Sequence, residues 1–349
     1  MATPTLTARP FAGANNFDLI RLLAALQVAV KHTLHHFGVE SPWTVLLGLM
    51  PGVPVFFFIS GFLIYQSWQN SSATSYFRNR SLRIFPGLIG CTVFGLALVL
   101  ASGYLSTQQV PAARVAFWFA TQVTVLQMYN PDFLRGFGVG VLNGSLWTIS
   151  VELCFYVLTP LVFYLTRKRR WVWAPLVLAF CLANVFMPQT ASSTIEKAYS
   201  ISFVPWLYMF LVGAWLSTQP ALVARILSLH LAAVIGINVL VGGAGHLLGL
   251  AIAENAINPA SFCTLVLLIL KLAYTMPELS RRIVGRNDIS YGVYIFHMPV
   301  VNVMLFYGLS GVVHVWVALG ATLAMATISW FIIEKPALSL KRTSTRHDA

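Results

Sequence analysis

The sequence predicts an all-α protein, a polytopic transmembrane helical bundle with about ten spans. Of its 349 residues, 58% are hydrophobic and only 9% are charged, whereas soluble domains carry about 25% charged residues. The mean hydropathy is +0.76. These values exclude an ordinary soluble domain and indicate an integral membrane protein.

The apolar residues gather in stretches that a membrane span of about 20 residues requires. A shorter apolar stretch, 115–128, is expected to be an amphipathic or re-entrant segment on the outer side. A basic loop between about 69 and 83 and a polar interruption near 254–259 separate neighbouring spans. The expected spans are 16–37, 52–68, 85–103, 147–166, 171–187, 203–217, 226–243, 260–276, 289–308 and 312–333.

Lysine and arginine are distributed unevenly between the two sides of this arrangement. Arg114, Arg135 and Lys197 fall on one side. Because basic loops stay in the cytoplasm, the side that carries most of the lysines and arginines is cytoplasmic. Both termini lie on that side. We therefore expect cytoplasmic tails at 1–15 and 337–349, a membrane domain at 16–336, and no nucleic-acid partner despite the net charge of +12. The cytoplasmic side carries Arg9, Arg78, Arg80, Arg83, Arg167, Lys168, Arg169, Arg170, Arg225, Arg281, Arg282, Arg286, Lys335, Lys341, Arg342 and Arg346.

The first expected span contains four charged or titratable residues, Asp18, Arg21, Lys31 and His32. Such residues at membrane depth are costly and mark a functional site by default. Arg21 and His32 are eleven residues apart, which is about three helical turns and roughly 16 Å along one face. His32 could act as a general base, or it could lie at the headgroup level beside His35 and His36; Arg21 on the same face favours function.

Two further groups of polar residues have a functional and a structural interpretation. Arg80 and Arg83 lie at the cytoplasmic surface, where they could bind phosphates or only set topology. Glu152, just inside an apolar helix, could bind an acceptor, orient His32 or pair with Lys31. The cysteines show no metal-ligand spacing, so we expect no metal site.

Tyr294 and His297 are three residues apart and share one helix face. They could line a cavity, or they could join helices as satisfied core residues.

Six motifs follow one another along the chain: Phe17-Asp18-Leu19-Ile20-Arg21 to His32, Gly52 to Leu63, Arg80-Ser81-Leu82-Arg83-Ile84-Phe85-Pro86, Leu146 to Glu152 with Phe155-Tyr156, Ser290-Tyr291 to His297, and Glu334-Lys335-Pro336. In this order they resemble acyltransferase family 3, the polytopic membrane O-acyltransferases that acetylate bacterial surface glycans. The resemblance covers about 16–336 and predicts a stand-alone enzyme without the esterase-like domain of some members. Departures from the family pattern are Leu22, where many members have Gly, and Thr148 in place of Ser.

The resemblance implies transfer of an acyl group, most often acetyl, from cytoplasmic acyl-CoA to a sugar hydroxyl of a glycan or lipid-linked sugar, in the bacterial inner membrane. It makes acetyl-CoA a co-substrate and requires no metal. Arg21, Arg80 and Arg83 would hold the CoA phosphates. His32 would deprotonate the acceptor or form a transient acyl-histidine.

The resemblance also assigns supporting roles. Glu152 would be the second catalytic residue, near the acceptor or beside His32, and Asp18 would orient Arg21. Trp147, Tyr291, Tyr294 and His297 would support or bind substrate. The rival hypotheses are a non-enzymatic transporter or flippase of lipid-linked sugars, and a structural membrane subunit of unspecified oligomeric state.

Overall fold

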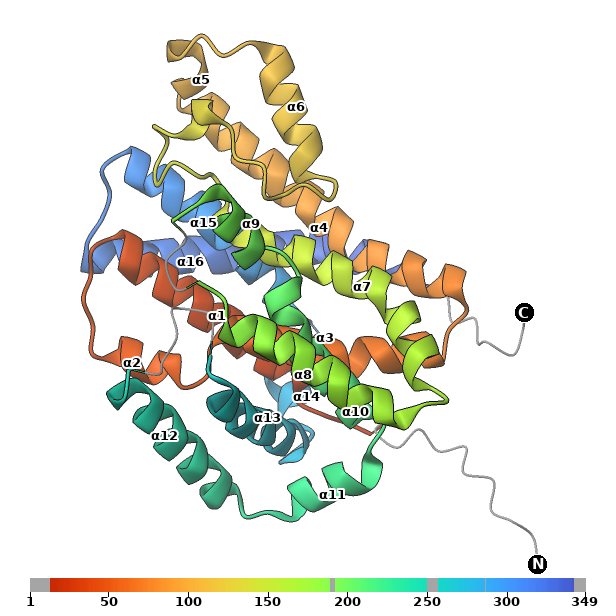
Figure 1. Cartoon of the computed structure of the whole chain (residues 1–349). Coiled ribbons are helices and arrows are strands. Elements are labelled where there is room, and N and C mark those ends of the chain that lie inside the picture. The colour runs from red at the N-terminus through yellow and green to blue at the C-terminus, as the bar shows by residue number, and fades with distance from the viewer. Residues whose placement is uncertain (1–12, 189–191, 250–256, 286, 342–349) are drawn as a thin grey trace, which may run out of the picture.

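In a computed structural model the chain is a bundle of helices, described for residues 13–188, 192–249, 257–285 and 287–341 (Figure 1). The described residues contain helices and no strands. The predicted tails at 1–15 and 337–349 lie largely outside the described residues, as does the first half of the polar interruption near 254–259.

Each stretch predicted to span the membrane contains a helix. The longer helices are α1 (Phe17–His36), α3 (Gly52–Gln69), α4 (Ala73–Ala101), α7 (Trp147–Thr166), α8 (Trp173–Val185), α10 (Leu207–Ser217), α12 (Leu231–Leu247), α13 (Pro259–Tyr274), α15 (Ser290–Phe306) and α16 (Val312–Ser329). Short helices connect them: α2 (Trp43–Gly48), α5 (Tyr104–Thr107), α6 (Ala112–Gln122), α9 (Thr194–Ser200), α11 (Pro220–Ser228), α14 (Leu279–Val284) and α17 (Lys335–Ser339).

Five helical segments of the described chain are long and apolar enough to cross a membrane, and a sixth results if α11 and α12, bent by 94°, form one broken span. The predicted number was about ten. The difference has two physical sources. Helix α1 carries the charges of Asp18, Arg21 and Lys31. Helices α8, α13 and α15 have 13, 16 and 17 residues, and at 1.5 Å per residue they are shorter than the roughly 30 Å of bilayer hydrocarbon.

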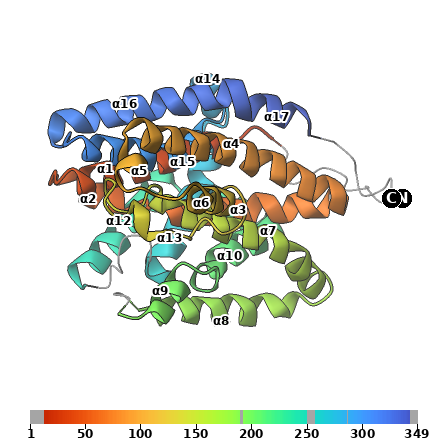
Figure 2. The ribbon, with the colours of Figure 1, turned by 90° about the horizontal axis from the view of Figure 1, so that it is seen from above.

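Helix α15 is the centre of the bundle, because nearly all of its side chains are buried. It packs against α1, α4 and α16. Helices α3 and α10 approach closely because each has a glycine at the contact: a Cβ on Gly61 would lie 2.0 Å from the Phe210 carbonyl oxygen. Figure 2 shows α16 and α8 on opposite sides of the bundle, with α3 between them.

Two prolines inside helices free backbone carbonyls to accept hydrogen bonds from other segments. Proline lacks an N–H, so the carbonyl four residues earlier loses its helical partner. Pro299 leaves the Ile295 carbonyl to accept a hydrogen bond from the Asn143 side-chain amide at 2.8 Å. Pro160 in α7 likewise leaves the Tyr156 carbonyl, which accepts from the Tyr76 hydroxyl of α4 at 3.1 Å.

The basic stretch at 69–83 was expected to be a loop, and this expectation was wrong. Helix α4 begins at Ala73 and includes Arg80 and Arg83. The Ser72 side chain caps it by accepting from the Ser75 backbone N–H at 3.3 Å. The arginines therefore have fixed positions on a helix.

The segment at 115–128 was expected to be amphipathic or re-entrant. The structure has the short helix α6 there, and with α5 it extends beyond the rest of the bundle in Figure 1. Asn302 of α15 ties the following loop to the bundle through the carbonyls of Val141 and Leu142, both at 3.1 Å.

Candidate active site

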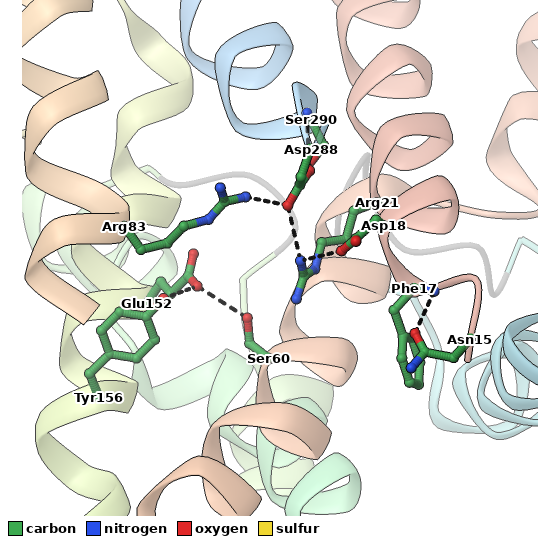
Figure 3. Close-up of polar contacts among 10 residues, drawn as sticks. All are labelled: Asn15, Phe17, Asp18, Arg21, Ser60, Arg83, Glu152, Tyr156, Asp288 and Ser290. Atoms are coloured by element: carbon green, nitrogen blue, oxygen red, sulfur yellow. Dashed lines mark hydrogen bonds and ion pairs between the residues drawn. The ribbon is translucent and has the colours of Figure 1, made fainter. Parts of the chain in front are cut away.

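An aspartate that the sequence reading did not single out joins two of the predicted arginines. Asp288 Oδ2 accepts from Arg21 at 3.2 Å and from Arg83 at 2.5 Å (Figure 3). Its other oxygen accepts from the hydroxyl and the backbone N–H of Ser290, the first residue of α15. Asp288, the residue before the N-cap of α15, thus bonds the first residue of that helix and connects α1, α4 and α15.

The charge on Asp288 is stabilised by its neighbours. Burial acts to raise the pKa of this carboxyl, but the guanidinium groups of Arg83 and Arg21 and the bonds from Ser290 outweigh it, so the pKa is held below its ordinary value. Its side chain is 12% exposed. Asp18 also contacts Arg21, at 3.2 Å, but its side chain is 51% exposed; its orienting role stays a prediction.

A narrow cavity of about 70 Å³ lies beside this ion-pair network. All three predicted arginines line it, from α1 and α4, so three basic side chains share one small cavity. Its other polar lining residues are Ser60, Thr148, Glu152, Tyr156, Ser290, Tyr291 and Tyr294.

Arg80 and Arg83 are held differently at this cavity. The Arg83 guanidinium bonds Asp288 and lies 5.8 Å from the centre of the Tyr291 ring, whose hydroxyl donates to the Ile84 carbonyl. The Arg80 guanidinium lies 5.9 Å from the centre of the Tyr156 ring. Among the described residues its buried Nε has no hydrogen-bond partner, and a buried donor of this kind calls for a ligand.

Glu152 lies in the same cavity as the arginines. Its Oε1 accepts from Ser60 of α3 at 3.2 Å and from Tyr156, one turn further along α7, at 2.5 Å (Figure 3). From the sequence, the expected neighbour of Glu152 was an acceptor, His32 or Lys31. The structure instead places its carboxylate with a serine and a tyrosine on the arginine side.

His32 and His297 are in direct contact. His32 Nδ1 and His297 Nε2 are 2.9 Å apart, and His297 Nδ1 is 2.6 Å from the Tyr294 carbonyl oxygen. His297 is fully buried. The sequence placed Tyr294 and His297 on one face but gave no indication that the face meets His32.

Helices α1 and α15 carry both the charged site and the histidine site. Arg21 meets Asp288 at one end, and His32 meets His297 further along both helices, so the two helices run side by side in the same direction. The cavity extends toward the histidines as far as Tyr294, which bonds Thr148 at 2.7 Å and packs against Phe56. Neither histidine is among its described lining residues.

Trp147 and Lys31 do not line the cavity that the arginines share. Trp147 packs against Phe57 and Trp206 in the core and does not line the described cavity. Lys31 lines a separate open hollow of about 910 Å³ together with His35 and Glu40. No cluster of three or more possible metal ligands occurs within the part of the chain that the structure describes.

Asp288 and Ser60 are the site residues that sequence reasoning missed. Asp288 stands in a basic loop directly before Ser290-Tyr291, and an acidic residue at a helix start is a signal that could have found it. Ser60 lies next to Gly61 in α3. Gly61 does make the close contact, whereas Ser60 bonds Glu152.

Comparisons with known proteins agree with this architecture. A family model described as an acyltransferase domain matches residues 15–334. Nodulation protein 10 of Rhizobium leguminosarum bv. viciae is 33% identical over 359 residues, which cover 94% of each chain. An O-acetyl transferase of Shigella phage Sf6 is 25% identical, covering 92% of this chain and 95% of its own. O-acetyltransferase OatA of Staphylococcus aureus is 26% identical over 42% of this chain and 24% of its own.

No solved structure matches the chain significantly. The family model covers nearly all of the described bundle, including the arginine cavity and both histidines. The chain therefore belongs to acyltransferase family 3, and it is a membrane acyltransferase.

Proposed function

We propose that this protein transfers an acyl group, in the first instance acetyl, from cytoplasmic acyl-CoA to a sugar hydroxyl of a surface or secreted glycan. The observation that carries the proposal is that three arginines line one cavity between α1, α4 and α15, and that α1 and α15 also carry the histidine pair. The relatives named O-acetyl transferases support the reaction class.

The arginine end is the donor site in this proposal. CoA carries several phosphate charges, and guanidinium groups bind phosphate bidentately. Asp288 keeps Arg21 and Arg83 in place, and the Arg80 Nε that has no partner among the described residues offers a donor to an incoming phosphate. Glu152, Ser60 and Tyr156 provide polar groups deeper in the cavity for the amides of the pantetheine arm.

The acceptor comes from the opposite side. The hollow of about 910 Å³ is lined by Lys31, His35 and Glu40. Lys31 precedes His32, so a sugar in this hollow would approach His32 from the side away from the arginines. For the thioester to reach His32, the pantetheine arm must pass Tyr294 and Phe56 at the end of the cavity.

His32 is the general base of the reaction. It takes the proton of the acceptor hydroxyl as the oxygen attacks the thioester carbon. The new C–O bond forms, the C–S bond breaks, and the leaving CoA thiolate receives the proton from the His32 imidazolium. In the alternative route His32 is the nucleophile: an N–C bond forms as the C–S bond breaks, and the acceptor oxygen then forms the C–O bond as the N–C bond breaks, its proton passing to the CoA thiolate.

The finer topology is part of the proposal. We place ten spans in the bacterial inner membrane, both termini and the tails at 1–15 and 337–349 in the cytoplasm, and one catalytic domain at 16–336. The basic loop that ends at Asp288 lies against the start of α1, which agrees with the cytoplasmic assignment of both segments by their charges.

Mass spectrometry of surface glycans and secreted glycolipids tests the function directly. Cells lacking the gene are complemented with the wild-type gene, with His32→Ala or with an empty vector. We expect an acetylated species only with the wild type. If all three strains yield the same acetylation, or if the purified protein binds no acyl-CoA and moves lipid-linked sugars instead, the proposal is wrong and the transporter hypothesis replaces it.

A further inference from the structure

The contact between His32 and His297 determines where the proton sits on each ring. A backbone carbonyl can only accept, so His297 Nδ1, 2.6 Å from the Tyr294 carbonyl oxygen, carries a hydrogen. His297 is fully buried, and no ion pair to it occurs among the described residues. An unpaired buried imidazolium would be costly, so His297 is neutral and its Nε2 carries a lone pair.

The ring of His32 must match this arrangement. Its Nδ1 faces the His297 Nε2 lone pair at 2.9 Å, and a hydrogen bond at this distance requires that His32 Nδ1 donates. In a neutral His32 the hydrogen is then on Nδ1 and the lone pair is on Nε2. The basic nitrogen is the one that faces away from His297.

The geometry points to His297 as the positioning residue of the reaction: it fixes His32 in the tautomer whose Nε2 is the base. The inference rests on the proposed function, in which His32 deprotonates the acceptor. When His32 accepts the proton on Nε2, its Nδ1–H keeps the same bond to His297. The ring therefore stays oriented through the proton transfer, and His297 needs no contact with substrate.

Helix α15 is suited to this task because it is held firmly. Tyr294 holds His297 through its carbonyl and bonds Thr148 of α7 through its hydroxyl. Five residues beyond His297, Asn302 bonds the loop carbonyls of Val141 and Leu142. A chain of two hydrogen bonds thus connects the backbone of a buried helix to the nitrogen of His32.

Two substitutions of His297 separate positioning from packing. In His297→Gln the amide oxygen can accept from His32 Nδ1–H and the amide nitrogen can donate to the Tyr294 carbonyl. His297→Leu keeps an apolar side chain of similar volume without an acceptor. Both are purified in lipid nanodiscs, and kcat and the KM for acetyl-CoA are measured.

We expect His297→Leu to lower kcat about 10- to 100-fold, the usual effect of losing a partner that orients a reactive histidine. The KM for acetyl-CoA should change less than about threefold, because the arginine cavity is untouched. His297→Gln should recover most of the lost kcat. Acetyl-CoA binding by each variant shows that it is folded.

Nitrogen-15 NMR of the histidine rings in the wild type is a second measurement that needs no His297 variant. The signals that vanish in His32→Ala belong to His32. We expect its Nδ1 to be protonated and its Nε2 to be unprotonated at neutral pH. A His32 ring with a protonated Nε2 and an unprotonated Nδ1 would overturn the inference, as would full kcat in folded His297→Leu.

The inference and the proposed function fail in different ways. If His32→Ala is inactive while His297→Leu retains wild-type kcat, only the positioning role is lost. If His32→Ala retains activity, the base assignment itself is wrong. If His297→Leu does not fold, the kcat of His297→Gln and the wild-type NMR tautomer decide the question.

Discussion

The two ends of the α1–α15 helix pair differ in the kind of polar group that they bring together. At one end Arg21 meets Asp288, and the surroundings are charged: three guanidinium groups and a carboxylate whose pKa is held below its ordinary value. At the other end His32 meets His297, whose described hydrogen-bond partners are an imidazole ring and a backbone carbonyl. The same two helices thus build a site suited to holding anions and a site suited to moving one proton.

The difference shows why the two ends need to be separate. Arginines beside His32 would favour its neutral form but would also hold the donor phosphates at the reacting atoms. A spacing of eleven residues between Arg21 and His32, roughly 16 Å along a helix, leaves room for the pantetheine arm between phosphate and thioester. Variants at each end should therefore affect different kinetic constants.

The largest effect is expected from His32→Ala. Loss of a general base lowers turnover by about 10²- to 10⁴-fold. The measurement is acetate incorporated into surface glycan, with the amount of protein in the membrane determined by immunoblotting. Wild-type acetylation at an equal protein level would remove the histidine end from the mechanism.

The second effect concerns the charged end. Arg80→Ala combined with Arg83→Ala should raise the KM for acyl-CoA by about 100-fold or more, since each lost charge-assisted hydrogen bond costs about 1.5–3 kcal/mol. Arg167→Ala with Arg170→Ala is the matched control: it removes the same charge at the end of α7, outside the described cavity. An equal effect of both pairs would mean that only the overall charge of the cytoplasmic face matters.

Asp288→Asn tests the link between α1, α4 and α15. It leaves Arg21 and Arg83 without their shared carboxylate, and removing one partner of a buried pair costs about 3 kcal/mol of unfolding free energy. The pKa of Asp288 is lowered, so its contribution is present above the ordinary value of about 3.9 and is lost only as the pH falls through the lower folded value.

Thermal unfolding in detergent between pH 5 and pH 8 measures this contribution. The difference between the wild type and Asp288→Asn should stay constant over that range. A difference that disappears on acidification from pH 8 to pH 6 would show that Asp288 is not the ionised centre of the network.

The smallest effects are expected at Glu152 and its partner Ser60. Glu152→Gln keeps an acceptor for Ser60 and Tyr156 but removes the charge. We expect about a tenfold increase in the KM for acyl-CoA, typical of weakening a few polar contacts, with the acceptor KM unchanged. Ser60→Ala should cause a smaller change in the same constant. A change confined to the acceptor KM would place Glu152 on the other side of the reaction, as the sequence alone had suggested.

Much of the fold could be predicted because apolar length is a local property. The expected span at 147–166 and helix α7 have the same bounds, and α3 begins at Gly52 as expected. The start of α4 was missed because the low hydropathy of a stretch with three arginines predicts a loop. In the structure a serine cap and neighbouring helices stabilise a helix there.

The site was predicted in its residues more than in its contacts. Arg21, Arg80 and Arg83 were grouped from their cytoplasmic position, and they do line one cavity. The partner of Glu152 and the bond between His32 and His297 depend on how α1, α3, α7 and α15 are rotated against each other, 92 to 265 residues apart in sequence. No local pattern in the chain carries that information.

The central claim is that donor binding and proton transfer occur at opposite ends of one helix pair. Equilibrium binding of radiolabelled acetyl-CoA to the purified wild type, His32→Ala and Arg80→Ala/Arg83→Ala in nanodiscs tests it most directly. We expect His32→Ala to bind within about threefold of the wild type while the arginine variant loses most of its affinity, by about 100-fold. Binding that is lost in His32→Ala and retained in the arginine variant would contradict the claim.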